Sequence, residues 1–182
     1  MSVFEKIIYF ISGTMAVPPI FGIWHIVSLV LVATLTVLAC VYLKNAEEKL
    51  VKRILIVVYA LIVVLEIMKQ FIFAFSYSDG KVSWNYAWYM FPFQLCSSQL
   101  YILPFAIFLP DGKVKDACIS YLMTFSFFGG FVVMLYPGDV FTYWIGINIQ
   151  TMIHHGLQVI IGIFFAVRYK DKLNFKFFDF IY

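Results

Sequence analysis

Long apolar runs, each close to the thickness of a lipid bilayer, are the feature of this sequence that most limits what it can fold into. Cutting the sequence at charge clusters, Pro and Gly leaves about five segments of roughly 20 residues. As helices rising 1.5 Å per residue, each spans about 30 Å, which matches the hydrocarbon core of a membrane. The predicted crossings are residues 22–43, 54–75, 88–109, 117–136 and 143–167.

The composition agrees with a chain embedded in a membrane. Of the 182 residues, 63% are hydrophobic and only 13% are charged, which is far from the usage of a soluble domain. We therefore predict an all-α fold: a polytopic transmembrane helix bundle of about five crossings that forms a single integral membrane domain over residues 1–182. Residues 3–13 precede Pro18 and Pro19 and are predicted to form a short helix lying at the membrane interface.

Basic residues are distributed unevenly between the two sides of the predicted bundle. With five crossings, the side that holds the N-terminus carries only Lys6 and Lys81, whereas the other side carries ten Lys and Arg residues. The positive-inside rule then predicts a multi-pass cell-membrane protein with its N-terminus outside and its C-terminus in the cytoplasm. The net charge of +3 gives no reason to expect nucleic acid as a partner. The expected partner is the phospholipid bilayer, and the oligomeric state stays open.

Two short stretches, FPFQLCSSQL and NIQTMIHHGL, place polar side chains inside these apolar runs. Polar groups in hydrocarbon are costly, so those that remain usually have a function. Counted from the outer ends of their helices, Cys96 and His154 lie about 12 and 17 Å below the outer face. By the same count, His25 and Glu66 lie about 8 and 14 Å deep. The unusual side chains are thus predicted to share one layer in the outer half of the membrane.

The polar residues of the fifth segment share one helical face at 100° per residue, and this face is expected to turn towards the bundle interior. Its candidate site residues are Gln150, His154, His155 and Gln158. On the third segment, Gln94 and Gln99 flank Cys96 together with two serines. A helix that is polar on most sides over two turns is expected to be surrounded by protein.

Each of these features also has a purely structural explanation. Glu66 and Lys69 stand at i and i+3, where an intrahelical ion pair lowers the cost of two charges. The His doublet can bond across a helix interface, with Gly156 permitting close approach, and the glycines at 129–130 indicate close helix packing. A structural role and a functional role for these residues both stay open on the sequence.

Metal chemistry is not expected at the two histidines. Consecutive residues on a helix point about 100° apart, so His154 and His155 cannot chelate one metal as an i, i+4 pair does. The predicted crossings offer no carboxylate ligand beyond Glu66 to complete a site. We therefore predict no metal and no other cofactor.

A thiol and an imidazole at one depth suggest covalent chemistry. A thiol in apolar surroundings reacts poorly unless a base takes its proton or a cation stabilises the thiolate. A facing His154 could supply either function to Cys96. These two residues are the predicted catalytic pair, and the remaining candidates are assigned to binding or to supporting positions around them. Those candidates are His155, Gln94, Gln99, Gln150, Gln158, His25 and Glu66.

Four motifs occur in order along the chain: FG..H at 21–25, a buried acid at Glu66, P.QLC at 92–96 and Q..IHHG at 150–156. In this order the chain resembles the YwaF-like family of small bacterial integral membrane proteins over about residues 20 to 170. The most specific element is a Cys after Pro-x-x-Leu with a His doublet 58 residues later. Animal relatives of that family include a cysteine-dependent membrane acyltransferase that remodels ether phospholipids.

The resemblance implies that Cys96 accepts the acyl group and that His154 is its partner base, with His155 close by. This sequence departs from the family pattern at Gln94, because family members often have a His before the Leu-Cys pair. Family members are also commonly longer, with a further helix after the segment that carries the histidines. In the implied reaction a thiolate attacks a phospholipid ester, and a second lipid hydroxyl then takes the acyl group. Gln94, Gln99 or Gln150 could hold the oxyanion.

Two other functions fit the same residues. The polar layer could be an outward-facing pocket of a small-molecule binding or transport protein, in which Gln150, His154 and Gln158 recognise the ligand. It could also serve only to hold the helices of a packing or assembly protein together. The acyltransferase hypothesis is the one that requires Cys96.

Overall fold

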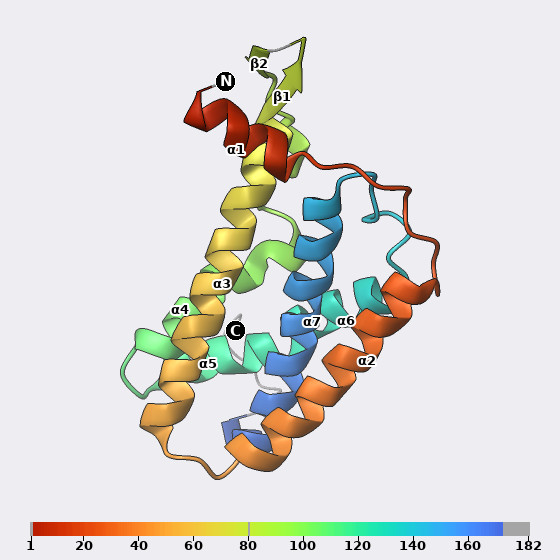
Figure 1. The fold of residues 1–182 in the computed structure, drawn as a ribbon. Coiled ribbons are helices and arrows are strands. Elements are labelled where there is room, and N and C mark those ends of the chain that lie inside the picture. Colours follow the sequence, from red (N-terminus) through yellow and green to blue (C-terminus); the bar gives the residue numbers. More distant parts are fainter. Residues whose placement is uncertain (1, 80, 173–182) are drawn as a thin grey trace.

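The computed structural model describes residues 2–79 and 81–172, and these are mostly helical (Figure 1). The α-helices are α1 (Val3–Ile11), α2 (Ile23–Leu38), α3 (Glu48–Ala74), α4 (Ser98–Phe108), α5 (Lys113–Tyr121), α6 (Phe127–Leu135) and α7 (Ile145–Arg168). The strands β1 (Phe75–Ser78) and β2 (Lys81–Trp84) form one antiparallel hairpin. The prediction of an all-α helix bundle is confirmed, and the small hairpin was not predicted.

Three helices in the described part of the chain are long and apolar enough to cross a membrane. They are Ile23–Leu43, Lys113–Leu135 and Ile145–Arg168. The first extends α2 by a π-helical turn, and the second joins α5 to α6 through another. These helices correspond to the first, fourth and fifth predicted crossings. The 27-residue helix α3 covers the second predicted crossing and begins earlier than predicted, at Glu48.

Helix α7 is the central element of the bundle, and it lies between α2 and α3 in Figure 1. About 67% of its apolar span is buried, against 6% for α2, so α7 faces protein while α2 faces outward. Glycines permit the close approach of its neighbours. A Cβ on Gly156 would lie 2.5 Å from Cγ2 of Val32 in α2, and one on Gly162 would lie 2.5 Å from Cβ of Phe127 in α6.

The third predicted crossing, residues 88–109, is not a single helix. A 3-10 turn at Trp88–Met90 is followed by the non-helical residues 91–94, and a second 3-10 turn at Leu95–Ser97 leads into α4. Pro92 explains the break, because proline lacks the N–H of a helical residue and disfavours helical backbone in the residue before it. Cys96 therefore lies in the first turn of the helical stretch Leu95–Phe108.

The predicted N-terminal helix is present as α1, which ends at Ile11. Ser2 and Glu5 form a capping box that satisfies two backbone N–H groups at its start. In Figure 1, α1 lies across the end of α3 beside the hairpin, and the ring of Phe4 packs edge-on against Phe75 at 5.1 Å. Helix α1 and the hairpin thus form a cap at this end of the bundle.

Arg168 joins three helices at the opposite end. Its Nη1 donates to the carbonyl oxygens of Leu43 and Lys44, at 2.8 and 2.9 Å, and its Nη2 pairs with Glu48 at 2.7 Å. The Tyr169 hydroxyl also donates to Glu48, at 2.8 Å. Burial and this bond to a carboxylate raise the pKa of Tyr169 to about 12. The network fixes the end of α2, the start of α3 and the end of α7 to one another.

Candidate functional site

The carbonyl oxygen of Cys96 is the point at which the third and fifth predicted segments meet. His154 Nε2 lies 2.9 Å from it, and Gln158 Nε2 donates to it at 2.6 Å. Both donors come from α7, one turn apart, and both are buried. Because a carbonyl oxygen can only accept, the His154 proton must lie on Nε2. The structure therefore brings Cys96 and His154 together, through the backbone of the cysteine.

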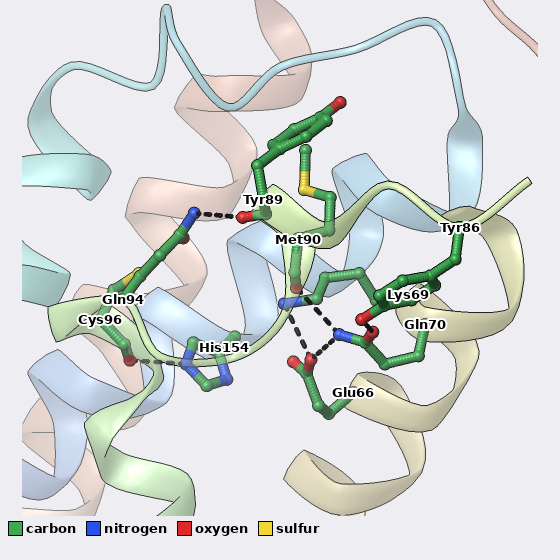
Figure 2. Close-up of polar contacts among 9 residues, drawn as sticks. All are labelled: Glu66, Lys69, Gln70, Tyr86, Tyr89, Met90, Gln94, Cys96 and His154. Atoms are coloured by element: carbon green, nitrogen blue, oxygen red, sulfur yellow. Dashed lines mark hydrogen bonds and ion pairs between the residues drawn. The ribbon is translucent and has the colours of Figure 1, made fainter. Parts of the chain in front are cut away.

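The thiol of Cys96 points elsewhere. It donates a hydrogen bond to Oε1 of Gln94 at 3.6 Å, and in Figure 2 the sulfur lies on the Gln94 side while the carbonyl faces His154. The N–H of Ser97 is bonded to the carbonyl of Gln94 at 2.9 Å. The N–H of Cys96 belongs to the first turn of a helix, where the dipole favours negative charge. Contact between the sulfur and Nδ1 of His154 would require the imidazole to leave the carbonyl, because Nδ1 and Nε2 point to nearly opposite sides of the ring.

Each histidine of the doublet keeps one ring nitrogen without a hydrogen-bond partner among the described residues. Nδ1 of His155 lies 2.8 Å from the Thr151 carbonyl, so that nitrogen carries the proton. His154 Nδ1 and His155 Nε2 are buried and unpaired in the same part of the chain. Both nitrogens are therefore unprotonated, and the lone pair of each is bare, meaning that it has no hydrogen-bond partner. A bare imidazole nitrogen can accept a proton, which is the requirement for a general base.

The glycine pair of α6, Gly129 and Gly130, lets this helix pack closely against α7 and the segment around Cys96. A Cβ on Gly130 would lie 2.5 Å from Cβ of Gln158 and 2.7 Å from the carbonyl oxygen of His155, distances that real side chains do not adopt. A Cβ on Gly129 would lie 3.9 Å from Cα of Cys96, which is ordinary contact. The prediction of close helix packing at this pair is confirmed, and the tighter contact is at Gly130.

A second polar network lies beside the site, on α3 (Figure 2). Lys69 Nζ and Glu66 Oε1 are 2.9 Å apart, which confirms the predicted ion pair. Gln70 Nε2 donates to Glu66 at 2.6 Å and to the carbonyl of Met90 at 3.0 Å. The hydroxyl of Tyr86 donates to Gln70 Oε1 at 2.5 Å. Glu66 is thus bonded to its neighbours on α3 rather than to a histidine.

Gln70 is the residue that the sequence analysis missed. Its amide donates to the carbonyl of Met90, which lies six residues before Cys96. Gln70 therefore connects α3 to the segment that leads to Cys96. The only signal in the sequence is that Gln70 directly follows the charged Lys69. Through Gln70 and Met90, the Glu66–Lys69 pair is connected to the segment that carries Cys96. The α3 network therefore borders the candidate site.

His25 does not join this site. Its Nε2 lies 2.7 Å from the carbonyl oxygen of Met134, and its Nδ1 accepts a hydrogen bond from the N–H of Phe21 at 3.0 Å. Met134 is in the last turn of α6, where carbonyl groups lack partners within the helix. His25 thus connects the start of α2 to the end of α6.

The predicted amides fall in three different settings. Gln94 is exposed and donates weakly to the Tyr89 carbonyl at 3.4 Å. Gln99 is fully buried on α4, and neither of its amide atoms has a partner within residues 2–79 and 81–172. Gln150 is buried on α7, one turn before His154. Within the same ranges, no three His, Cys, Asp or Glu side chains are grouped so as to hold a metal ion.

Comparison with known families gives one match. A model of the TMEM164 family matches residues 20–182, a span that includes His25, the α3 network, Cys96 and the whole of α7. No curated protein and no solved structure matches the chain significantly. Because the family model covers most of the sequence, the chain belongs to the TMEM164 family of transmembrane proteins.

Proposed function

We propose that this protein is a membrane-embedded lipid acyltransferase that carries an acyl group on Cys96 and moves protons through His154. One observation carries the proposal: His154 is bonded to the carbonyl of Cys96 and keeps its other ring nitrogen buried and bare. The thiol branches from the same residue, separated from that carbonyl carbon only by Cα and Cβ. The resemblance to the YwaF-like family and its cysteine-dependent relatives supports the same assignment.

In the first half-reaction, the imidazole of His154 leaves the carbonyl of Cys96 and turns, so that its unprotonated nitrogen takes the thiol proton. The thiolate then attacks the ester carbonyl of a phospholipid, so that a C–S bond forms and the ester C–O bond breaks. The proton held on His154 passes to the departing lipid alkoxide. In the second half-reaction a lipid hydroxyl gives its proton to His154 and attacks the thioester, and the proton returns to the sulfur as the C–S bond breaks.

The surroundings of Cys96 favour negative charge at the two points where this chemistry creates it. The N–H of Cys96 lies in the first turn of the helical stretch Leu95–Phe108, where it can stabilise a thiolate or an oxyanion, whereas the N–H of Ser97 is already bonded to the carbonyl of Gln94. On the α3 side, the Glu66 carboxylate 2.9 Å from the Lys69 ammonium offsets its positive charge. Removal of one oxyanion donor typically costs about 100- to 1,000-fold in rate, so these groups matter energetically.

The test compares cysteines within one chain. Cys96→Ala should abolish the transfer of a labelled acyl chain between phospholipids in reconstituted vesicles. Cys40→Ala and Cys118→Ala are the matched controls, because both residues are also half-buried free cysteines but lie away from the histidines. A trapped, hydroxylamine-sensitive acyl adduct should appear on Cys96 alone. Full transfer by the Cys96→Ala protein would disprove the mechanism.

The second candidate is an outward-facing small-molecule binding or transport protein. Unpaired amide atoms favour it: both polar atoms of Gln99 and Oε1 of Gln158 are buried without partners in the described part of the chain, and a ligand could satisfy them. In that case Cys96→Ala would retain ligand binding, whereas Gln158→Leu would reduce it. The two candidates therefore respond oppositely to loss of the thiol.

The proposed orientation places the N-terminus outside and the C-terminus in the cytoplasm. The uneven distribution of Lys and Arg supports it. One of the ten basic residues, Lys176, lies outside the described residues. A cysteine introduced at Ser78, in the hairpin, should react with a membrane-impermeant maleimide added to intact cells, whereas one introduced at Asp111 should not.

A further inference from the structure

The segment that precedes Cys96 is exposed although it is not helical. Residues 91–94 form no helix, and the side chains of Phe93 and Leu95 are 80% and 55% exposed. The carbonyl of Cys96 meets His154, which lies nine residues, or about 14 Å, inside α7 from Ile145. Non-helical backbone at such a depth is tolerated only where protein buries it or where it lines a water-containing cavity. The exposed segment is therefore expected to border an opening.

Side chains of other helices bind the backbone at both ends of this segment. Gln70 of α3 binds the carbonyl of Met90, and His154 and Gln158 of α7 bind the carbonyl of Cys96. Among the described residues, no side chain of another helix is hydrogen-bonded to residues 91–95. The two tethers span the space between α3 and α7, as Figure 2 shows.

The side chains between the tethers form an apolar strip, which we define as Phe91, Phe93 and Leu95. The rings of Phe91 and Phe93 are 4.7 Å apart, and Phe93 continues to Tyr101 of α4 at 6.3 Å. The strip ends directly at Cys96. A long apolar ligand lying on it would place its polar end at the first-turn N–H groups and the thiol.

We infer that residues 91–95 are a lateral entrance, through which an acyl chain of a membrane phospholipid reaches Cys96 along this strip. The inference rests on the proposed function for the reaction at Cys96, but it concerns where the lipid binds. A phospholipid satisfies both surfaces of the entrance: its acyl chain covers the aromatic rings, and its hydrated ester region meets the backbone polar groups that hydrocarbon alone would leave unpaired.

The binding test uses a Cys96→Ser protein in detergent micelles, so that no transfer reaction is needed. The probe is a phosphatidylcholine with a photoreactive diazirine in one acyl chain, and the sites of cross-linking are mapped by mass spectrometry. Phe128, on the exposed face of α6 at 63% exposure, is the internal control for lipid that merely surrounds the protein. Cross-linking within 91–95 should saturate and be displaced by unlabelled phosphatidylcholine, whereas cross-linking at Phe128 should rise in proportion to the probe.

The outcomes separate this inference from the proposed function. Equal, non-saturable cross-linking at both places would overturn the entrance. Saturable cross-linking at 91–95 without any Cys96-dependent transfer would leave the entrance in place and remove the acyltransferase.

A kinetic test uses the full chain with Cys96 intact. Phe93→Ala should raise the KM for the donor phospholipid about tenfold and leave kcat within about twofold, because it removes apolar contact with the bound chain. Phe128→Ala should change neither value. An unchanged KM in the Phe93→Ala protein would contradict the inference.

Discussion

His25 and His154 are both buried histidines whose Nε2 is bonded to a main-chain carbonyl of another segment, but their second ring nitrogens differ. In His25, Nδ1 accepts a hydrogen bond from the N–H of Phe21. In His154, Nδ1 has no partner within residues 2–79 and 81–172. The first ring is fully bonded and connects two helices, whereas the second keeps a lone pair. Burial and membrane depth alone therefore do not distinguish a histidine whose ring nitrogens are both bonded from one that keeps a free lone pair.

The largest expected effect comes from removing the bare nitrogen. His154→Leu should reduce acyl transfer about 100- to 10,000-fold, the range that general base catalysis contributes. The fold should persist, because Gln158 still donates to the carbonyl of Cys96. Transfer in vesicles and thermal unfolding in detergent measure the two effects. Undiminished transfer by this variant would place His154 in the same class as His25.

His25→Leu should give the opposite result. It leaves the buried carbonyl of Met134 without a partner and removes the acceptor of the Phe21 N–H, which should lower the free energy of unfolding by about 1 to 3 kcal/mol. Transfer per folded molecule should stay close to that of the unchanged protein. His25→Gln, which can restore one of the bonds, is the control. A stable but inactive His25→Leu protein would contradict the distinction.

The adjacent glycines of α6 test how closely this helix packs against Gln158 and His155 of α7. Gly130→Ala forces its new methyl group against Gln158 and the His155 carbonyl and should destabilise the protein by about 1 to 3 kcal/mol, with a loss of transfer. Gly129→Ala, one residue earlier, meets only ordinary contacts and should be nearly neutral. Equal effects of the two substitutions would refute the predicted closeness at Gly130.

The smallest effect is expected from the α3 tether. Gln70→Leu breaks the bond to Met90 and should cost about 1 kcal/mol, whereas Tyr86→Phe breaks only the bond to Gln70. The released segment should let Cys96 react faster with N-ethylmaleimide relative to Cys118, and the increase should be larger for Gln70→Leu. An unchanged ratio of alkylation rates would mean that His154 and Gln158 hold the segment alone.

Much of the helical framework could be predicted, because bilayer-length apolar runs and helical periodicity depend on sequence alone. The polar face of α7, the Glu66–Lys69 pair and the glycine packing of α6 all followed from spacing along a helix. The helix predicted over 88–109 was wrong in its first half, because one proline and the tertiary contacts of Met90 and Cys96 decide that segment.

The proximity of Cys96 and His154 was predictable from the sequence, but the atoms that meet were not. Spacing and depth placed Cys96 near His154, yet nothing in a helical wheel says that the imidazole meets the carbonyl rather than the thiol. That detail depends on the non-helical backbone before Leu95 and on a side-chain rotation. His25 was predicted to belong with Cys96 and His154 because its depth, counted along the helix, is similar. The sequence does not reveal that His25 is bonded to the Met134 carbonyl at the end of α6.

The polar face of α7 also bears on how the chain enters the membrane during synthesis. Of the three candidate spans, α7 leaves the ribosome last and is the least apolar. A segment with Asn148, Gln150 and two histidines partitions poorly from the translocon into lipid by itself. The earlier helices and the carbonyl of Cys96 precede α7 in the chain, so they are already synthesised when it emerges and can receive its polar face. Insertion of α7 should therefore depend on the helices made before it more than insertion of the strongly apolar α2 does.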